Sequence, residues 1–178
     1  CTSFFLIMSR QQSQKEQHVV FLDGEGVVWH GGTSIPGAEE AIEMMRSKGF
    51  RVIILTNNAS RSSAQYVKRL NEGGFHGFTE RDVVTSSVAV SNYLVRLGFN
   101  QPNRKIFVIG TEGFINQLTK KGMTVLTKTD FQGKVIEEME LDQSVGAVVV
   151  GSSDEFNYSD VAIATRFVIE NDAMLLSA

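Results

Sequence analysis

Short apolar runs alternate with amphipathic stretches along most of the chain. The first run, residues 18–22, is short and β-branched, ends at Asp23 and is closed by two glycines, so it predicts a buried strand. Residues 38–47 then place apolar side chains on one helical face, and Gly49 ends this helix. The alternation continues with expected strands at 51–55 and 83–85, a helix capped by Ser60 that ends near residue 72, and a helix at 88–97.

The second half of the chain repeats this rhythm after a polar connector. Residues 100–104 contain one of only two prolines, and we expect a domain boundary there. Further strands are expected at 106–109, 123–126, 145–150 and 173–176, with helices at 114–120 and 158–170. Strands that alternate with helices predict an α/β fold with parallel sheets. We therefore expect two domains, 18–102 and 103–178.

The N-terminal segment carries no such pattern. Residues 1–7 are apolar, but the stretch is too short for a signal peptide and lacks a basic start. Met8 is followed by a polar run and looks like a true start. We interpret residues 1–7 as upstream sequence or a fragment end, and we expect disorder over 1–17.

Composition narrows the class of partner. The 178 residues carry 17 basic and 20 acidic side chains, and this net charge of −3 gives no basic excess for a nucleic acid. No apolar run is long enough to span a membrane. The single cysteine, Cys1, excludes an intrachain disulfide, and a reducing, cytoplasmic compartment fits best. The three histidines lie far apart and lack the pairing of zinc motifs.

Two expected strand ends carry side chains suited to phosphate chemistry. At the first, Asp23 can attack phosphorus, and Glu25 can protonate the leaving oxygen and then activate water. Gly24 lets the backbone approach a phosphate, and two carboxylates offer the oxygen ligands that Mg²⁺ prefers. At the second, Thr56 and Asn57 can donate hydrogen bonds to phosphoryl oxygens. Taken separately, either cluster could be a plain solvated turn or a helix cap. Their occurrence at neighbouring parallel strand ends favours one shared site.

Three motifs follow one another in the first half of the chain. They are Phe-Leu-Asp-Gly-Glu-Gly-Val-Val-Trp-His-Gly at 21–31, Ile-Pro-Gly-Ala at 35–38 and Ile-Leu-Thr-Asn-Asn-Ala-Ser-Arg at 54–61. These motifs resemble the haloacid-dehalogenase superfamily, in the branch that contains 4-nitrophenylphosphatase, phosphoglycolate phosphatase and pyridoxal-phosphate phosphatase. Weaker matches lie at 83–87, 108–113 and 149–158. The resemblance runs from about residue 18 to the end, with the motifs in order.

The resemblance implies a Mg²⁺-dependent phosphatase for small phosphorylated metabolites that works through an aspartyl-phosphate. Asp23 would be the nucleophile and a magnesium ligand, and Glu25 the general acid/base, with its backbone carbonyl on the metal. Thr56 would bind the phosphoryl group, with Asn57 beside it. Residues 18–102 would be the N-terminal part of a Rossmann-like core, and 103–178 an inserted α/β cap. Caps of this branch often mediate dimers, so a homodimer is expected.

The cap would close over the site and select the substrate. Glu112 would lie in a substrate loop of the cap or in a plain turn. Asp154 and Tyr158 would lie on the cap face nearest the substrate or in a solvated loop. The substrate itself is not readable from these residues.

Two departures from the family pattern favour a second interpretation. The family has aspartate where this chain has Glu25, and the additional methylene moves the carboxyl by about 1.5 Å. The family's lysine and second acidic pair follow the cap, and no such segment occurs before Ala178, so we expect a truncated chain with little activity. A catalytically degenerate relative acting as a binding or structural protein is the alternative. A nucleotide-binding module lacks its glycine motif here, and a receiver domain would need an aspartate after the third strand.

Overall fold

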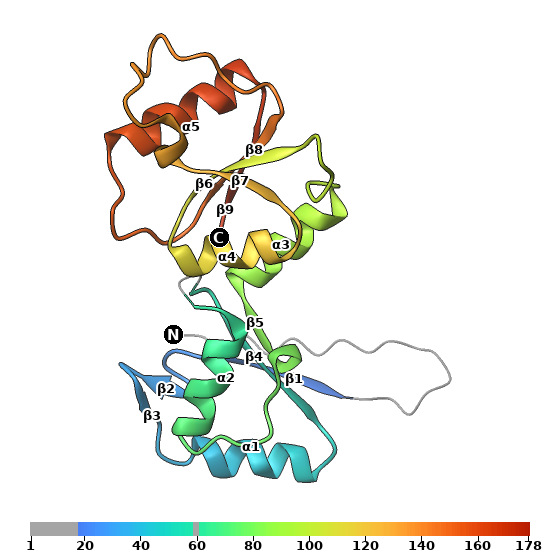
Figure 1. The fold of residues 1–178 in the computed structure, drawn as a ribbon. Coiled ribbons are helices and arrows are strands. Elements are labelled where there is room, and N and C mark those ends of the chain that lie inside the picture. The colour runs from blue at the N-terminus through green and yellow to red at the C-terminus, as the bar shows by residue number, and fades with distance from the viewer. Residues whose placement is uncertain (1–17, 59–60) are drawn as a thin grey trace. The chain divides into compact units, whose positions relative to one another are not determined.

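The computed structural model describes residues 18–58 and 61–178, arranged as two compact units (Figure 1). The first unit comprises the chain up to Thr56 together with Ser63–Val84, and the second comprises Asn57–Ser62 together with Thr85–Ala178. The expected disorder over 1–17 lies outside the described residues. Within those residues, no helix is both long enough and apolar enough to cross a membrane.

The first unit is built on a small sheet with the strand order β1-β4-β5, beside a separate two-stranded hairpin, β2-β3. Strands β1 and β4 are parallel, and Val19 to Asp23 lie opposite Arg51 to Leu55. The elements of this part are β1 (Val19–Asp23), β2 (Trp29–His30), β3 (Thr33–Ser34), α1 (Ala38–Ser47), β4 (Arg51–Thr56), α2 (Ser63–Glu72), the 3-10 helix η1 (Glu80–Asp82) and β5 (Val83–Thr85).

A single apolar core holds these elements together. Leu22 and Ile54 come from paired positions of β1 and β4, and Ile42 and Leu70 come from the inner faces of α1 and α2. At the start of β4, the Arg51 guanidinium lies 3.0 Å from the Asp82 carboxylate of η1. The core contacts of Leu22 and Ile54 lie next to the carboxyl ends of β1 and β4, whereas the Arg51–Asp82 pair secures the opposite end of β4.

The second unit contains a four-stranded parallel sheet in the order β7-β6-β8-β9. Residues that alternate along β6 enter two different cores, so the sheet is buried on both faces. Ile106 and Val108 pack with helices α3 and α4, whereas Phe107 and Ile109 pack with α5. Its elements are α3 (Ser86–Arg96), β6 (Lys105–Ile109), α4 (Glu112–Lys120), β7 (Thr124–Leu126), the 3-10 helix η2 (Lys128–Phe131), β8 (Val145–Val150), α5 (Tyr158–Glu170) and β9 (Met174–Ser177).

Most elements lie where the hydrophobic pattern predicts them, and the α/β class with parallel strands is confirmed. The division into compact units, however, falls after Val84 and not at the proline-containing connector 100–104. Helix α3 is the reason, because its Leu94 is buried together with Phe99 and Ile106 in the second unit. The connector is therefore an internal turn of that unit.

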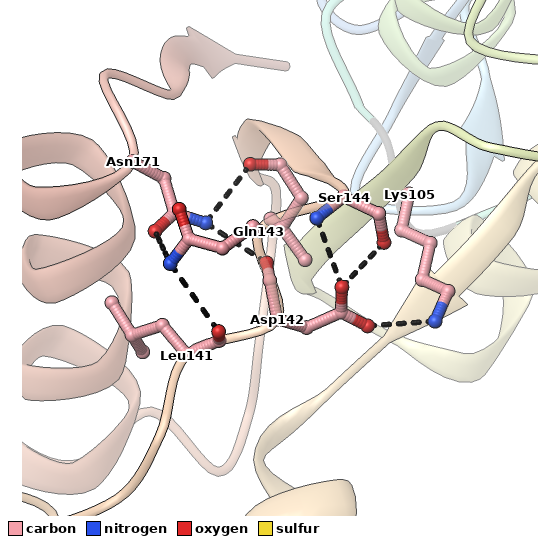
Figure 2. Close-up of polar contacts among 7 residues, drawn as sticks. Lys105, Leu141, Asp142, Gln143, Ser144 and Asn171 are labelled. Carbon is pink, nitrogen blue, oxygen red and sulfur yellow. Dashed lines mark hydrogen bonds and ion pairs between the residues drawn. The ribbon is translucent and has the colours of Figure 1, made fainter.

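A polar network closes the end of the second sheet where β6 and β8 begin (Figure 2). Asp142 accepts from Lys105 Nζ at 2.6 Å, from the Ser144 amide at 2.9 Å and from the Ser144 hydroxyl at 2.5 Å. The Asn171 side-chain amide, just beyond α5, donates to the Asp142 carbonyl at 2.9 Å. Lys105 and then Ser144 lower the pKa of Asp142 from 3.8 to about 2.

We expect this carboxylate to stabilise the second unit above pH 4 and to lose that effect as the pH falls towards 2. A depressed folded-state pKa means that the unfolded chain binds the proton first, so acid favours unfolding. Because both side chains are about one-third exposed, at 32% and 33%, solvent screening reduces the gain to about 1 kcal/mol. Urea unfolding of wild type and Asp142→Asn at pH 7 and pH 2.5 measures it. Equal differences between the two proteins at both pH values would contradict the assignment.

Candidate functional site

Asp23 is an exposed carboxylate at the carboxyl end of β1. It is the last residue of β1, and its side chain is exposed whereas Leu22 is buried. The structure therefore offers a carboxylate to solvent at the edge of a parallel strand pair, the region where ligands of open α/β sheets collect.

Thr56 ends the neighbouring strand at the same edge, but it lies one register position further on. Asp23 pairs with Leu55, and the Gly24 amide continues the ladder by donating to the Leu55 carbonyl at 3.2 Å. Side chains alternate between faces, so Thr56, which is 4% exposed, starts from the face opposite to that of Asp23. The strand register alone therefore does not bring the two side chains onto one face of the sheet.

Asn57 directly follows β4 and is exposed, and its backbone carbonyl accepts a hydrogen bond from the Ser86 hydroxyl at 3.0 Å. It groups with the second unit, whereas Thr56 groups with the first.

Gly24 is required by packing. A Cβ atom at this position would lie 2.3 Å from the indole ring of Trp29, far inside any real contact. Trp29 is 4% exposed and stacks on Tyr66 with ring centroids 5.7 Å apart. The Gly24 carbonyl accepts from the amides of Val28 and Trp29 at 3.0 and 3.1 Å. Because its amide and its carbonyl are both bonded, Gly24 shapes the loop under the site.

Glu25 is tied to the β2-β3 hairpin, which the sequence reasoning missed. Its Oε1 accepts from the Gly31 amide at 2.8 Å and lies 3.3 Å from His30 Nδ1. The available signal was the Gly31-Gly32 pair between two short segments, because two-residue hairpin turns need positive φ at both positions. The observed φ values are 54° and 104°.

The two carboxylates fit part of a magnesium site. Asp23 and Glu25 supply hard oxygen donors two residues apart, and both are exposed. Among residues 18–58 and 61–178, no group of three or more His, Cys, Asp or Glu side chains is arranged to hold a metal ion. Asp23 and Glu25 therefore supply oxygen atoms of the chemistry that Mg²⁺ prefers, but they belong to no such group.

The structure also places the three predicted cap residues. Glu112, the first residue of α4, and Asp154, after β8, line one hollow of about 460 Å³ in the second unit. The hollow lies at the carboxyl ends of β6 and β8. Tyr158 is not part of it. This residue is 78% exposed and lines a second hollow of about 440 Å³.

Lys128 lines both hollows and was not singled out from the sequence. Its ammonium donates to the Glu155 carbonyl at 3.0 Å and lies 3.6 Å from the buried Asp160 carboxylate. Asp160 in turn accepts from the Asn157 amide at the start of α5. No sequence pattern joins Lys128 to residues about thirty positions away, so only the fold reveals this contact.

A sequence profile described as haloacid dehalogenase-like hydrolase matches residues 20–124, more than half of the chain. The chain belongs to this family. The match includes both strand ends of the candidate site, and the resemblance stated from the motifs is confirmed.

Named relatives in this family are phosphatases. The chain is 34% identical over 182 residues to the chloroplastic phosphoglycolate phosphatase 1A of Arabidopsis thaliana, with 96% of this chain and 50% of that protein covered. It is 28% identical over 166 residues to the 4-nitrophenylphosphatase of Schizosaccharomyces pombe, with 89% of this chain and 55% of that protein covered. The chain thus spans about half the length of the curated relatives it matches.

A solved phosphatase structure also resembles this chain in fold. The structure matches the glycerol phosphate phosphatase of Mycobacterium tuberculosis, which was solved in complex with magnesium, with a TM-score of 0.66 and 27% identity. The match covers 89% of this chain and 43% of that one. The shared architecture confirms the predicted α/β phosphatase fold.

Proposed function

We propose that this chain is part of a Mg²⁺-dependent phosphomonoesterase that forms an aspartyl-phosphate at Asp23. The observation that carries the proposal is the exposed carboxylate at the carboxyl end of β1, which pairs in parallel with β4, the strand that ends at the buried Thr56. Family membership and the phosphatase names of the relatives support it.

In the proposed reaction, an Asp23 carboxylate oxygen attacks phosphorus in line with the ester oxygen. The new bond joins Asp23 to phosphorus, and the bond to the alcohol oxygen breaks as the protonated Glu25 donates its proton there. Glu25, now a carboxylate, then takes a proton from water, and the resulting hydroxide attacks phosphorus. Phosphate leaves, Asp23 is restored and Glu25 is protonated again.

Three further groups would support these steps. The Thr56 hydroxyl, with Asn57 beside it, would donate to phosphoryl oxygens beyond the strand ends. The Asp23 carboxylate and the Glu25 backbone carbonyl would hold Mg²⁺, which when bound neutralises charge on the phosphoryl group. Gly24 has no side chain, so the backbone at this position would leave room for the phosphate to approach.

We assign the first unit to the phosphatase core and the second unit to the cap that selects a small phosphorylated metabolite. The hollow lined by Glu112 and Asp154 is the proposed contact region of the cap, and exposed Tyr158 lies next to it. A homodimer through the cap and a cytoplasmic location stay predictions.

Metal removal tests the proposal. Protein produced from the complete reading frame should hydrolyse 4-nitrophenyl phosphate, lose on the order of 100-fold in rate with EDTA, and recover with added Mg²⁺. The 178-residue chain alone should be slow, because its described residues contain no group of three or more His, Cys, Asp or Glu side chains arranged to hold a metal ion. Rates that are the same with and without EDTA would contradict the metal assignment.

A catalytically degenerate relative is the second candidate, and the substitution of Glu25 for the family's aspartate favours it. Such a protein would fold and bind phosphate analogues, but it would show no turnover above the Asp23→Asn background. The same assay separates the two functions.

A further inference from the structure

The Glu25 side chain is held by the hairpin that follows it. Its Oε1 receives the Gly31 amide at 2.8 Å, and His30 Nδ1 lies 3.3 Å from the same oxygen. The one hydrogen-bond donor is Gly31, in the turn of the β2-β3 hairpin, whereas His30 is the last residue of β2, where it pairs with Thr33. The second carboxylate oxygen, Oε2, is not part of either contact.

The hairpin is packed against the core of the first unit, and this packing holds His30 and Gly31 in position. Trp29, which precedes His30, is buried against Gly24 and stacks on Tyr66. The Gly26 amide donates to the Trp29 carbonyl at 2.7 Å, and the Ile35 amide donates to the Val28 carbonyl at 3.0 Å. The loop that carries Glu25 and the hairpin that receives its side chain are therefore one bonded piece.

The length of the side chain matters for this contact. An aspartate at position 25 would end one methylene earlier, about 1.5 Å short. The distance from the carboxylate oxygen to the Gly31 amide would then exceed hydrogen-bond range. Only the longer glutamate reaches the turn in this backbone.

We propose that the turn of the β2-β3 hairpin anchors the Glu25 carboxylate, and that His30 is a positioning residue which adapts this site to glutamate. The inference rests on the proposed function for its catalytic meaning, while the anchor itself is a property of the described chain. One carboxylate oxygen is held by the turn, and Oε2 is left to exchange the proton with the leaving group and with water. On this proposal, the glutamate that stands where the family has aspartate is compensated by its contact with the hairpin turn.

The anchor is tested first without catalysis, by amide hydrogen exchange of Gly31 in the 178-residue chain. Glu25→Ala and Glu25→Asp should each speed exchange at Gly31 by about fivefold, because each removes the acceptor from the turn. Thr33→Ala is the matched control, because it alters the opposite strand of the hairpin and leaves the Gly31 amide, the His30 ring and the Glu25 carboxylate in place. Unchanged exchange at Gly31 in Glu25→Ala would overturn the anchor.

The positioning role is tested by kinetics on protein from the complete reading frame. His30→Ala should lower kcat by about threefold to fivefold, the scale of one side-chain polar contact, with little change in KM. Glu25→Asp should also lower kcat, although the family carries aspartate there. In the Glu25→Asp background, His30→Ala should have no further effect, since the contact is already lost.

The outcomes separate this inference from the proposed function. If the loss of kcat in the double variant equals the product of the losses caused by His30→Ala and Glu25→Asp alone, the positioning role is overturned. Such independent effects would indicate general damage to the hairpin. A gain in kcat with Glu25→Asp would overturn the adaptation. Absence of hydrolysis by the wild type would end the proposed function and with it the catalytic role of His30, whereas the exchange experiment would still decide the anchor.

Discussion

Replacing Asp23 with asparagine should reduce hydrolysis of 4-nitrophenyl phosphate by on the order of 10⁴-fold or more in protein from the complete reading frame. Asparagine keeps the size of the side chain but removes the charged oxygen that attacks phosphorus, so no aspartyl-phosphate can form. Steady-state rates with excess Mg²⁺ measure the loss. The side chain of Asp23 is exposed, and we expect the unfolding midpoint to stay unchanged.

Glu40→Gln provides the control for this prediction. Glu40 is an exposed carboxylate on α1 in the same unit, so its removal changes the net charge equally. It should retain full activity. If Asp23→Asn kept more than about 1% of the wild-type rate, a different residue would have to be the nucleophile.

Replacing Trp29 with alanine should destabilise the first unit by about 3–5 kcal/mol, the usual cost of truncating a buried aromatic side chain. The indole fills the space above Gly24, stacks on Tyr66, and lies beneath the Arg69 guanidinium at 4.9 Å from the ring centroid. Urea unfolding followed by a probe in the first unit measures the change. Trp29→Phe should cost less, because it keeps an aromatic ring in the space.

The contact between Trp29 and Gly24 gives this prediction an internal check. Gly24→Ala should destabilise wild type by about 1–3 kcal/mol, because the added methyl group meets a rigid ring. In the Trp29→Ala background the same substitution should be nearly neutral, since the ring is absent. Additive losses would show that Gly24 is needed for its backbone conformation and not for the space it leaves.

Periodic apolar patterns predicted the regular elements well because those elements are stabilised by burial. The ranges 38–47, 83–85, 145–150 and 158–170 match α1, β5, β8 and α5 at both ends. The 3-10 helices η1 and η2 were missed, because their single turns are held by capping contacts such as Thr79 with Asp82 and contain no apolar period. The placement of α3 in the second unit depends on which core buries Leu94, and a linear pattern carries no such information.

Some features of the candidate site could be proposed from the sequence, and others only from the structure. The chemistry of Asp23, Glu25 and Thr56 follows from residue type and position after a strand, so the sequence was enough to select them. The pairing register of Asp23 with Leu55 and the contact of Glu25 with the hairpin turn depend on side-chain lengths and backbone dihedrals that only coordinates supply. Lys128 joins the second unit's hollow through folding alone.

The grouping of Asn57 with Thr85–Ala178 bears on the design of chimeric proteins. The Ser86 hydroxyl donates to the Asn57 carbonyl, so the two positions belong to one hydrogen-bonded contact although they lie 29 residues apart. A chimera that takes the stretch from Thr85 onward from a relative keeps this contact only if the imported segment supplies a hydroxyl at position 86.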